Sequence, residues 1–145
     1  MNEKLKQLYQ TVILQKSKAP FQYEKRPDAT HQIEANNPVC GDRFTLYLDM
    51  ADGIIQDAAF YGHGCAISKS SASILTENII GLSKEEALSY SQKMKAIVDP
   101  KQALPDESED LLAFAAARDF PERETCATLA WEKLSAFLTQ RLSNN

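Results

Sequence analysis

An alternating stretch followed by a tight-turn pair constrains the fold of this chain more than any other feature. Apolar and polar residues alternate from Arg43 to Met50, which is the period of a strand with one buried face. Asp52-Gly53 then supplies a tight turn, and Ile54 to Tyr61 can return as the partner strand. His31 to Asn36 can add a third strand at the edge. We therefore expect a small three-stranded antiparallel sheet.

The other periodic patterns in the sequence are helical. Amphipathic spacing predicts a first helix over residues 3 to 17, followed by a loop at 21 to 30. Further helices are predicted from Cys65 to Gly81, from the capping box at Ser83 to about Val98, in a short piece from Leu111 to Phe120-Pro121, and from about Thr125 onward. The expected fold class is α+β, with the sheet packed against helices in one domain spanning residues 1–145.

Composition and charge exclude several classes of protein. No apolar run approaches the roughly 20 residues of a membrane span, so no membrane association is expected. The N-terminal segment has no apolar core of a secretory signal, and the expected location is the cytoplasm. The chain carries 16 basic and 20 acidic residues, a formal charge of -4, without a basic cluster interleaved with aromatic residues. Nucleic-acid binding is therefore not expected.

Three cysteines are the candidate chemistry of this chain. Cys40 lies in the turn Asn37-Pro38-Val39-Cys40-Gly41-Asp42, whereas Cys65 and Cys126 fall at predicted helix starts. A reducing cytoplasm disfavours disulfides, so a metal site or a reactive thiol fits better. Three thiols and the Asp42 carboxylate match a four-coordinate Zn²⁺ site. The alternative is that the cysteines are small buried apolar residues, and Cys126, on an apolar stripe, is the most open to it.

Two charged or titratable residues near the cysteines have possible roles. Arg123 lies three residues before Cys126 and could offset the negative charge of the thiolates, or it could be a solvated surface arginine. His63 could donate to the metal or carry a proton near Cys65, or it could be an exposed turn residue. His31 has no motif around it and receives no role.

Three motifs in order resemble the SufU branch of the IscU/NifU-like iron–sulfur assembly proteins. They are Asn37 to Asp42, Gly62-His63-Gly64-Cys65-Ala66-Ile67-Ser68, and Phe120 to Trp131. The resemblance covers nearly the whole chain and implies an α+β domain with a small antiparallel sheet. It also implies zinc bound by Cys40, Asp42, Cys65 and Cys126. It further implies that Cys40 accepts persulfide sulfur from a cysteine desulfurase, SufS or SufS-like, and passes it to downstream iron–sulfur assembly components.

The resemblance supports a zinc-dependent sulfurtransferase, in which Cys40 is catalytic and Arg123 assists, with two alternatives. The first is an IscU-type scaffold whose same ligands hold a nascent iron–sulfur cluster. Against it, the 61-position step from Cys65 to Cys126 is similar to the longer SufU spacing, and Thr125 stands where IscU-type scaffolds carry histidine. His63 departs from the acidic residue of the SufU branch. The second alternative is a domain with structural zinc that activates the desulfurase.

Overall fold

The computed structural model describes residues 3–37 and 41–143, and its centre is a three-stranded antiparallel sheet of order β1-β2-β3. The strands are β1 (His31–Asn37), β2 (Asp42–Ala51) and β3 (Ile54–His63). Between β2 and β3, Asp52 and Gly53 both have positive φ values, of 55° and 75°, as the predicted tight turn requires. The three-stranded sheet and the α+β class are thereby confirmed.

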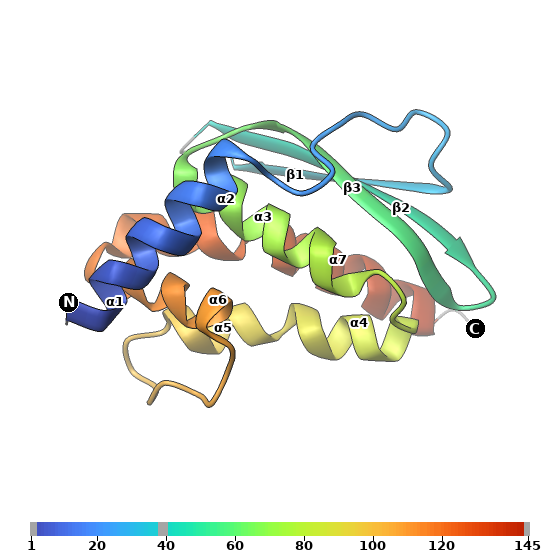
Figure 1. Ribbon diagram of the computed structural model, residues 1–145. Coiled ribbons are helices and arrows are strands. Elements are labelled where there is room, and N and C mark those ends of the chain that lie inside the picture. The colour runs from blue at the N-terminus through green and yellow to red at the C-terminus, as the bar shows by residue number, and fades with distance from the viewer. Residues whose placement is uncertain (1–2, 38–40, 144–145) are drawn as a thin grey trace.

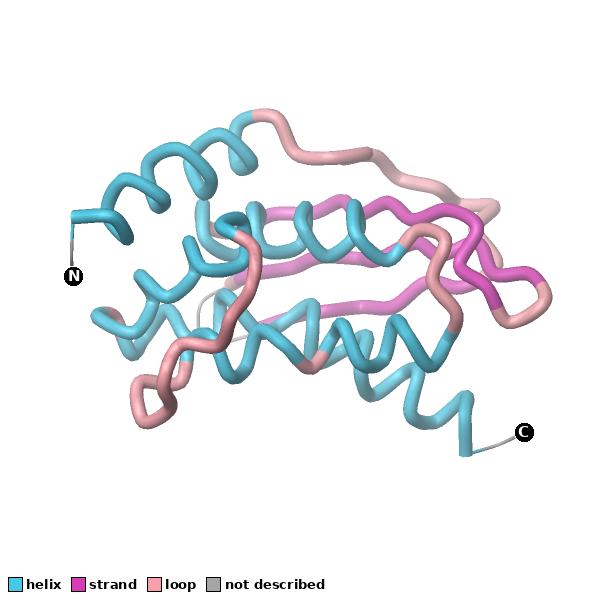
Figure 2. The backbone as a smooth tube through the Cα atoms, turned by 60° about the horizontal axis from the view of Figure 1, so that its bottom comes forward, coloured by secondary structure: helices cyan, strands magenta, loops and turns pink. Residues whose placement is uncertain are grey.

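The helices cover one face of this sheet (Figures 1 and 2). The helices Ala66–Ile79 and Glu124–Ser143 lie against the strands, and a second row of helices lies farther from the sheet. The helical elements are α1 (Glu3–Leu8), η1 (Tyr9–Ile13), α2 (Leu14–Lys18), α3 (Ala66–Ile79), α4 (Lys84–Ser91), α5 (Lys93–Val98), α6 (Glu109–Leu112), η2 (Ala113–Asp119), η3 (Pro121–Arg123) and α7 (Glu124–Ser143).

Alternation along the strands produces the buried face. Phe44, Leu46 and Leu48 of β2 are at most 2% exposed, and Leu46 pairs across the strands with Phe60 of β3. These side chains pack against helices α3 and α7 in one cluster of buried residues. The period-2 pattern of the sequence thus marks the core side of the sheet correctly.

Hydrogen bonds between buried groups connect helix α3 to helix α7. The Ser71 hydroxyl donates to the Ala127 carbonyl at 2.5 Å, and the Trp131 indole N–H donates to the Ser71 carbonyl at 3.1 Å. Trp131 also stacks on Tyr90 of α4, with ring centroids 5.1 Å apart. Because the start of α3 carries Cys65 and the start of α7 carries Cys126, these contacts set the positions of the two thiols.

The structure corrects two helix predictions. The single helix expected from Ser83 to Val98 is broken at Gln92, whose φ of -89° and ψ of -6° separate α4 from α5. The break lets Met94 and Ile97 of α5 become fully buried while Tyr90 reaches Trp131. The first helix likewise contains a π-helical turn at Tyr9–Ile13, which periodicity did not indicate.

Candidate metal centre

Asp42, Cys65 and Cys126 meet at one end of the sheet, although they are far apart in the sequence. Asp42 begins β2, Cys65 is the N-cap of α3, and Cys126 lies in the first turn of α7. One carboxylate oxygen and the two sulfur atoms all lie within 4.8 Å of one another. Cys40, the fourth predicted ligand and the predicted sulfur acceptor, lies outside the described residues, two positions before Asp42 in the sequence.

Two glycines allow the end of β3 and the start of α3 to approach the residues around Asp42. A Cβ atom on Gly62 would lie 1.9 Å from the Arg43 carbonyl oxygen. A Cβ atom on Gly64 would lie 2.4 Å from Ser68 Oγ and 2.7 Å from the Phe44 ring. Both positions therefore exclude any side chain, a reason for Gly62 and Gly64 that sequence reasoning missed.

Cys65 takes the N-cap position that serine or aspartate usually occupies. Its sulfur accepts a hydrogen bond from the Ser68 backbone N–H at 3.5 Å. Burial alone raises the pKa of the Cys65 thiol, but hydrogen bonds from Ser68 and Cys126 outweigh it and leave this pKa below the ordinary value. Cys65 is therefore the thiol that loses its proton more readily.

Cys126 behaves in the opposite way. It is 2% exposed, and burial together with the negative charges of Cys65 and Asp42 raises the pKa of its thiol. Without a bound metal ion, the Cys126 thiol thus keeps its proton and forms hydrogen bonds with Cys65 and Asp42. Cys126 is buried on the apolar side of α7 and also faces a thiol and a carboxylate, so its role as a metal ligand stays a prediction.

One carboxylate oxygen of Asp42 indicates that the cluster suits a cation. Its side chain is only 2% exposed, and Oδ1 accepts the Cys65 N–H at 3.4 Å. Oδ2 is buried without a hydrogen-bond partner among residues 3–37 and 41–143. An unsatisfied buried acceptor costs about 1–3 kcal/mol, and a carboxylate costs more. Two sulfurs and a carboxylate oxygen suit a borderline-soft divalent cation such as Zn²⁺, so the residues fit the expected metal.

Arg123 reaches the cluster from η3, where it is exposed to solvent. The guanidinium of Arg123 lies beside both sulfurs. Its hydrogen bond to Cys126 and the negative charge of Cys65 raise the pKa of Arg123. Arg123 and Cys65 also line a cavity of about 240 Å³, together with Tyr9. Tyr9 was not predicted as a site residue, because nothing in the sequence around it marks the π-helical turn that begins there.

The remaining predicted position, His63, does not belong to the group of described ligand atoms that lie within 4.8 Å of one another. His63 is an exposed residue at the end of β3, where it pairs with Arg43 and packs edge-on against the Tyr61 ring at 6.3 Å.

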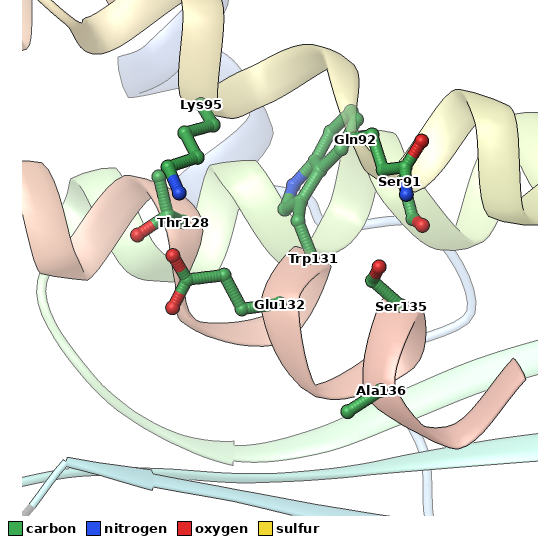
Figure 3. Close-up of a pocket in the computed structure, with 8 residues that line it drawn as sticks. All are labelled: Ser91, Gln92, Lys95, Thr128, Trp131, Glu132, Ser135 and Ala136. Carbon is green, nitrogen blue, oxygen red and sulfur yellow. The ribbon is translucent and has the colours of Figure 1, made fainter. Parts of the chain in front are cut away.

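A larger cavity of about 550 Å³ lies between α4–α5 and α7 (Figure 3). It is lined by side chains such as Gln92, Lys95 and Glu132 around Trp131, and it contains no cysteine.

Comparisons with known proteins assign the chain to a family. Residues 8–136 match the family model of the NifU-like N terminal domain, so the chain belongs to this family. It is 38% identical over 135 residues to the iron–sulfur cluster assembly scaffold protein IscU of Streptococcus pyogenes serotype M1, covering 90% of this chain and 82% of that protein. The resemblance inferred from the three motifs is thereby confirmed at the level of the family.

Two further relatives carry the SufU or SUF designation. The chain is 36% identical over 147 positions to the zinc-dependent sulfurtransferase SufU of Bacillus subtilis strain 168, covering 99% of this chain and 98% of that protein. A solved SUF-system scaffold protein of Fervidobacterium islandicum AW-1 superimposes with a TM-score of 0.76 at 31% identity, covering 90% of this chain and 96% of that chain.

In the part of the chain that the structure describes, no helix is both long and apolar enough to cross a membrane.

Proposed function

We propose that this protein is an iron–sulfur cluster assembly protein of the IscU/SufU type that acts as a zinc-dependent sulfurtransferase. Its substrate is the persulfide of a cysteine desulfurase of the SufS type, and its product is a persulfide on Cys40. The observation that carries the proposal is the cluster of Asp42, Cys65 and Cys126, in which a buried carboxylate oxygen has no hydrogen-bond partner among the described residues. The similarity to a named zinc-dependent sulfurtransferase over the full chain supports it.

In this proposal Asp42, Cys65, Cys126 and Cys40 hold Zn²⁺. When bound, zinc supplies a positive charge that keeps sulfur ligands deprotonated at neutral pH. Asp42 is a hard ligand among soft ones, which suits a site that exchanges a ligand rather than a closed structural one. Arg123 supports the cluster by placing a permanent positive charge beside the sulfurs, where it can also meet an incoming anionic persulfide.

The transfer step is a thiol–disulfide type exchange. The Cys40 thiolate attacks the outer sulfur of the desulfurase persulfide and forms a new sulfur–sulfur bond. The sulfur–sulfur bond of the donor breaks, and the desulfurase cysteine leaves as a thiolate that takes up a proton. No electrons are gained or lost overall. The cavity bounded by Tyr9, Cys65 and Arg123 offers space of about 240 Å³ beside the cluster for the persulfide side chain of the donor.

The proposal is tested by following sulfur from the desulfurase onto this chain. Zinc-loaded protein is incubated with the desulfurase and cysteine, and the persulfide is located by mass spectrometry of alkylated peptides. We expect one added sulfur on Cys40 in the wild type and in the exposed-site control Ser89→Ala, and none in Cys40→Ala. The desulfurase must still turn over with a small-molecule reductant in every sample. Persulfide uptake that survives Cys40→Ala would refute the assignment.

A second candidate is the IscU-type scaffold, favoured by the relative of Streptococcus pyogenes that carries that name at 38% identity. The same thiols and carboxylate would then hold an iron–sulfur cluster, since thiolate ligands suit both. A third candidate is a structural-zinc activator of the desulfurase. Asp42→Ala separates it from the sulfurtransferase, because loss of stability without loss of persulfide uptake would favour the structural role.

A further inference from the structure

A second polar pocket lies at the end of the sheet opposite the cysteines. It has a volume of about 230 Å³ and is lined by His31, Lys84, Arg141 and residues 50–53 of the β2–β3 turn. His31 begins β1 and pairs with Leu48, whereas the other end of β1 pairs with Asp42, so the two sites are separated by roughly 20 Å of strand. In Figure 1 the β2–β3 turn and the end of α7 lie opposite the beginnings of α3 and α7. We propose that this pocket binds a small oxyanion, a phosphate or a carboxylate.

Three basic side chains converge on the pocket from three elements. His31 comes from β1, Lys84 from the first turn of α4, and Arg141 from the last turn of α7. Neither Lys84 nor Arg141 forms an ion pair within the described part of the chain, and the acidic residue that lines the pocket, Asp52, is exposed in the turn. The pocket therefore carries excess positive charge on a chain whose net charge is -4.

Phe137 fixes the orientation of two of these groups. The Arg141 guanidinium carbon lies 4.8 Å from the centre of the Phe137 ring, and the His31 ring packs edge-on against the same ring at 5.3 Å. A stacked guanidinium keeps its N–H donors at its edge, where they suit the oxygens of a phosphate or carboxylate. The arginine and the histidine are thus held in place before an anion arrives.

The third group, Lys84, is held by the β2–β3 turn. Its backbone N–H donates to the Gly53 carbonyl at 3.1 Å, and its side-chain stem lies 3.8 Å from where a Cβ on Gly53 would be. An isolated bridge between Ile54 and Ser83 strengthens this connection between the hairpin and α4. The turn thus packs against the stem of Lys84 at the edge of the pocket.

His31 gives this site a pH dependence. Burial, and then the charges of Arg141 and Lys84, lower the pKa of His31, so the ring is neutral near pH 7. Thr30 Oγ1 lies 3.1 Å from its Nδ1, and Asp52 of the turn is the acidic group that lines the same pocket. A bound anion would favour the charged ring and raise this pKa. Anion binding therefore takes up a proton, and affinity increases as the pH falls.

The two histidines of the chain make a direct test possible. The ring resonances of His31 and His63 are followed by NMR from pH 5 to 8, with inorganic phosphate or with sodium chloride at equal ionic strength. We expect phosphate to raise the pKa of His31, and at a fixed pH to move the ring resonances of His31 but not those of His63, at the other end of the sheet. An equal response of both histidines, or none of either, would overturn the proposal.

Charge-removing variants test the geometry, and a second probe tests the type of anion. Lys84→Gln and Arg141→Gln should each weaken phosphate binding about fivefold to tenfold, whereas Lys101→Gln, an exposed lysine in the connection before α6, should not. Circular dichroism confirms that each variant is folded. Succinate in place of phosphate distinguishes a carboxylate site from a phosphate site. Equal weakening by all three variants would reduce the effect to overall charge and contradict the proposal.

Discussion

Replacing Asp42 by asparagine should make the metal-free protein more stable than the metal-free wild type, and the protein with zinc less stable than the wild type with zinc. The substitution keeps the shape of the side chain and an oxygen that can accept the Cys65 N–H, which Oδ1 now accepts at 3.4 Å. It replaces the buried oxygen that has no partner among the described residues by an uncharged amide nitrogen, which can donate a hydrogen bond to a neighbouring sulfur. Since a buried oxygen without a partner costs about 1–3 kcal/mol, the metal-free variant should be about 1 kcal/mol more stable than the metal-free wild type.

Zinc should reverse this order. At a zinc concentration about 100 times the wild-type dissociation constant, binding stabilises the wild type by about 2.7 kcal/mol. If loss of the carboxylate ligand weakens affinity about 100-fold, the variant gains only about 0.4 kcal/mol at the same concentration. The wild type then exceeds the variant by about 1.3 kcal/mol, a difference of roughly 3–5 °C in melting temperature.

Thermal unfolding followed by circular dichroism, with chelator and with zinc, measures both orders. Asp106→Asn is the matched control, since Asp106 is exposed and the change in charge is the same. The control should differ little from the wild type in either condition. An Asp42→Asn variant that is less stable without metal, or that gains as much from zinc as the wild type, would refute the reasoning.

Three further substitutions test how the site is positioned, in the first two cases, and how the start of α4 is capped, in the third. Trp131→Phe removes the hydrogen bond to the Ser71 carbonyl, and we expect a loss of about 2 kcal/mol in urea unfolding together with weaker zinc binding. Gly64→Ala should cost about 2 kcal/mol or more and weaken zinc binding, because its Cβ would lie 2.7 Å from the Phe44 ring. Glu86 accepts the N–H of the helix cap at 3.0 Å, and this bond lowers its pKa from 4.5. The stability that ionised Glu86 contributes is present above pH 4.5 and is lost as the pH falls through the pKa of the folded protein. In urea unfolding, the difference in free energy of unfolding between wild type and Glu86→Gln should therefore narrow from about pH 6 to 3. Unchanged stability in the first two, or a gap independent of pH in the third, would contradict these expectations.

Local sequence signals predicted most of the secondary structure. The alternation up to Met50, the turn Asp52-Gly53 and the capping box at Ser83 depend on neighbours in the chain, and all three are present in the structure. The break at Gln92 could not be predicted this way. It depends on how Tyr90 and the residues of α5 fit against distant elements, which local propensity does not encode.

In the candidate site, too, local sequence signals predicted some features, whereas others depend on contacts between distant residues. Local signals placed Cys65 at a helix start, and it is the N-cap of α3. They did not place Cys126 beside it, since that contact depends on the packing of α3 against α7 through Ser71. The three-motif resemblance supplied this proximity. The position of Tyr9 and the close approach at Gly64 became visible only in three dimensions.

The central claim is tested most directly by elemental analysis and an absorption spectrum of the full chain purified without added metal. The account predicts about one zinc per chain, no absorption in the visible range, and loss of that zinc in Cys65→Ser. Iron with labile sulfide and visible charge-transfer bands, or a protein that binds no metal when zinc is supplied, would contradict it.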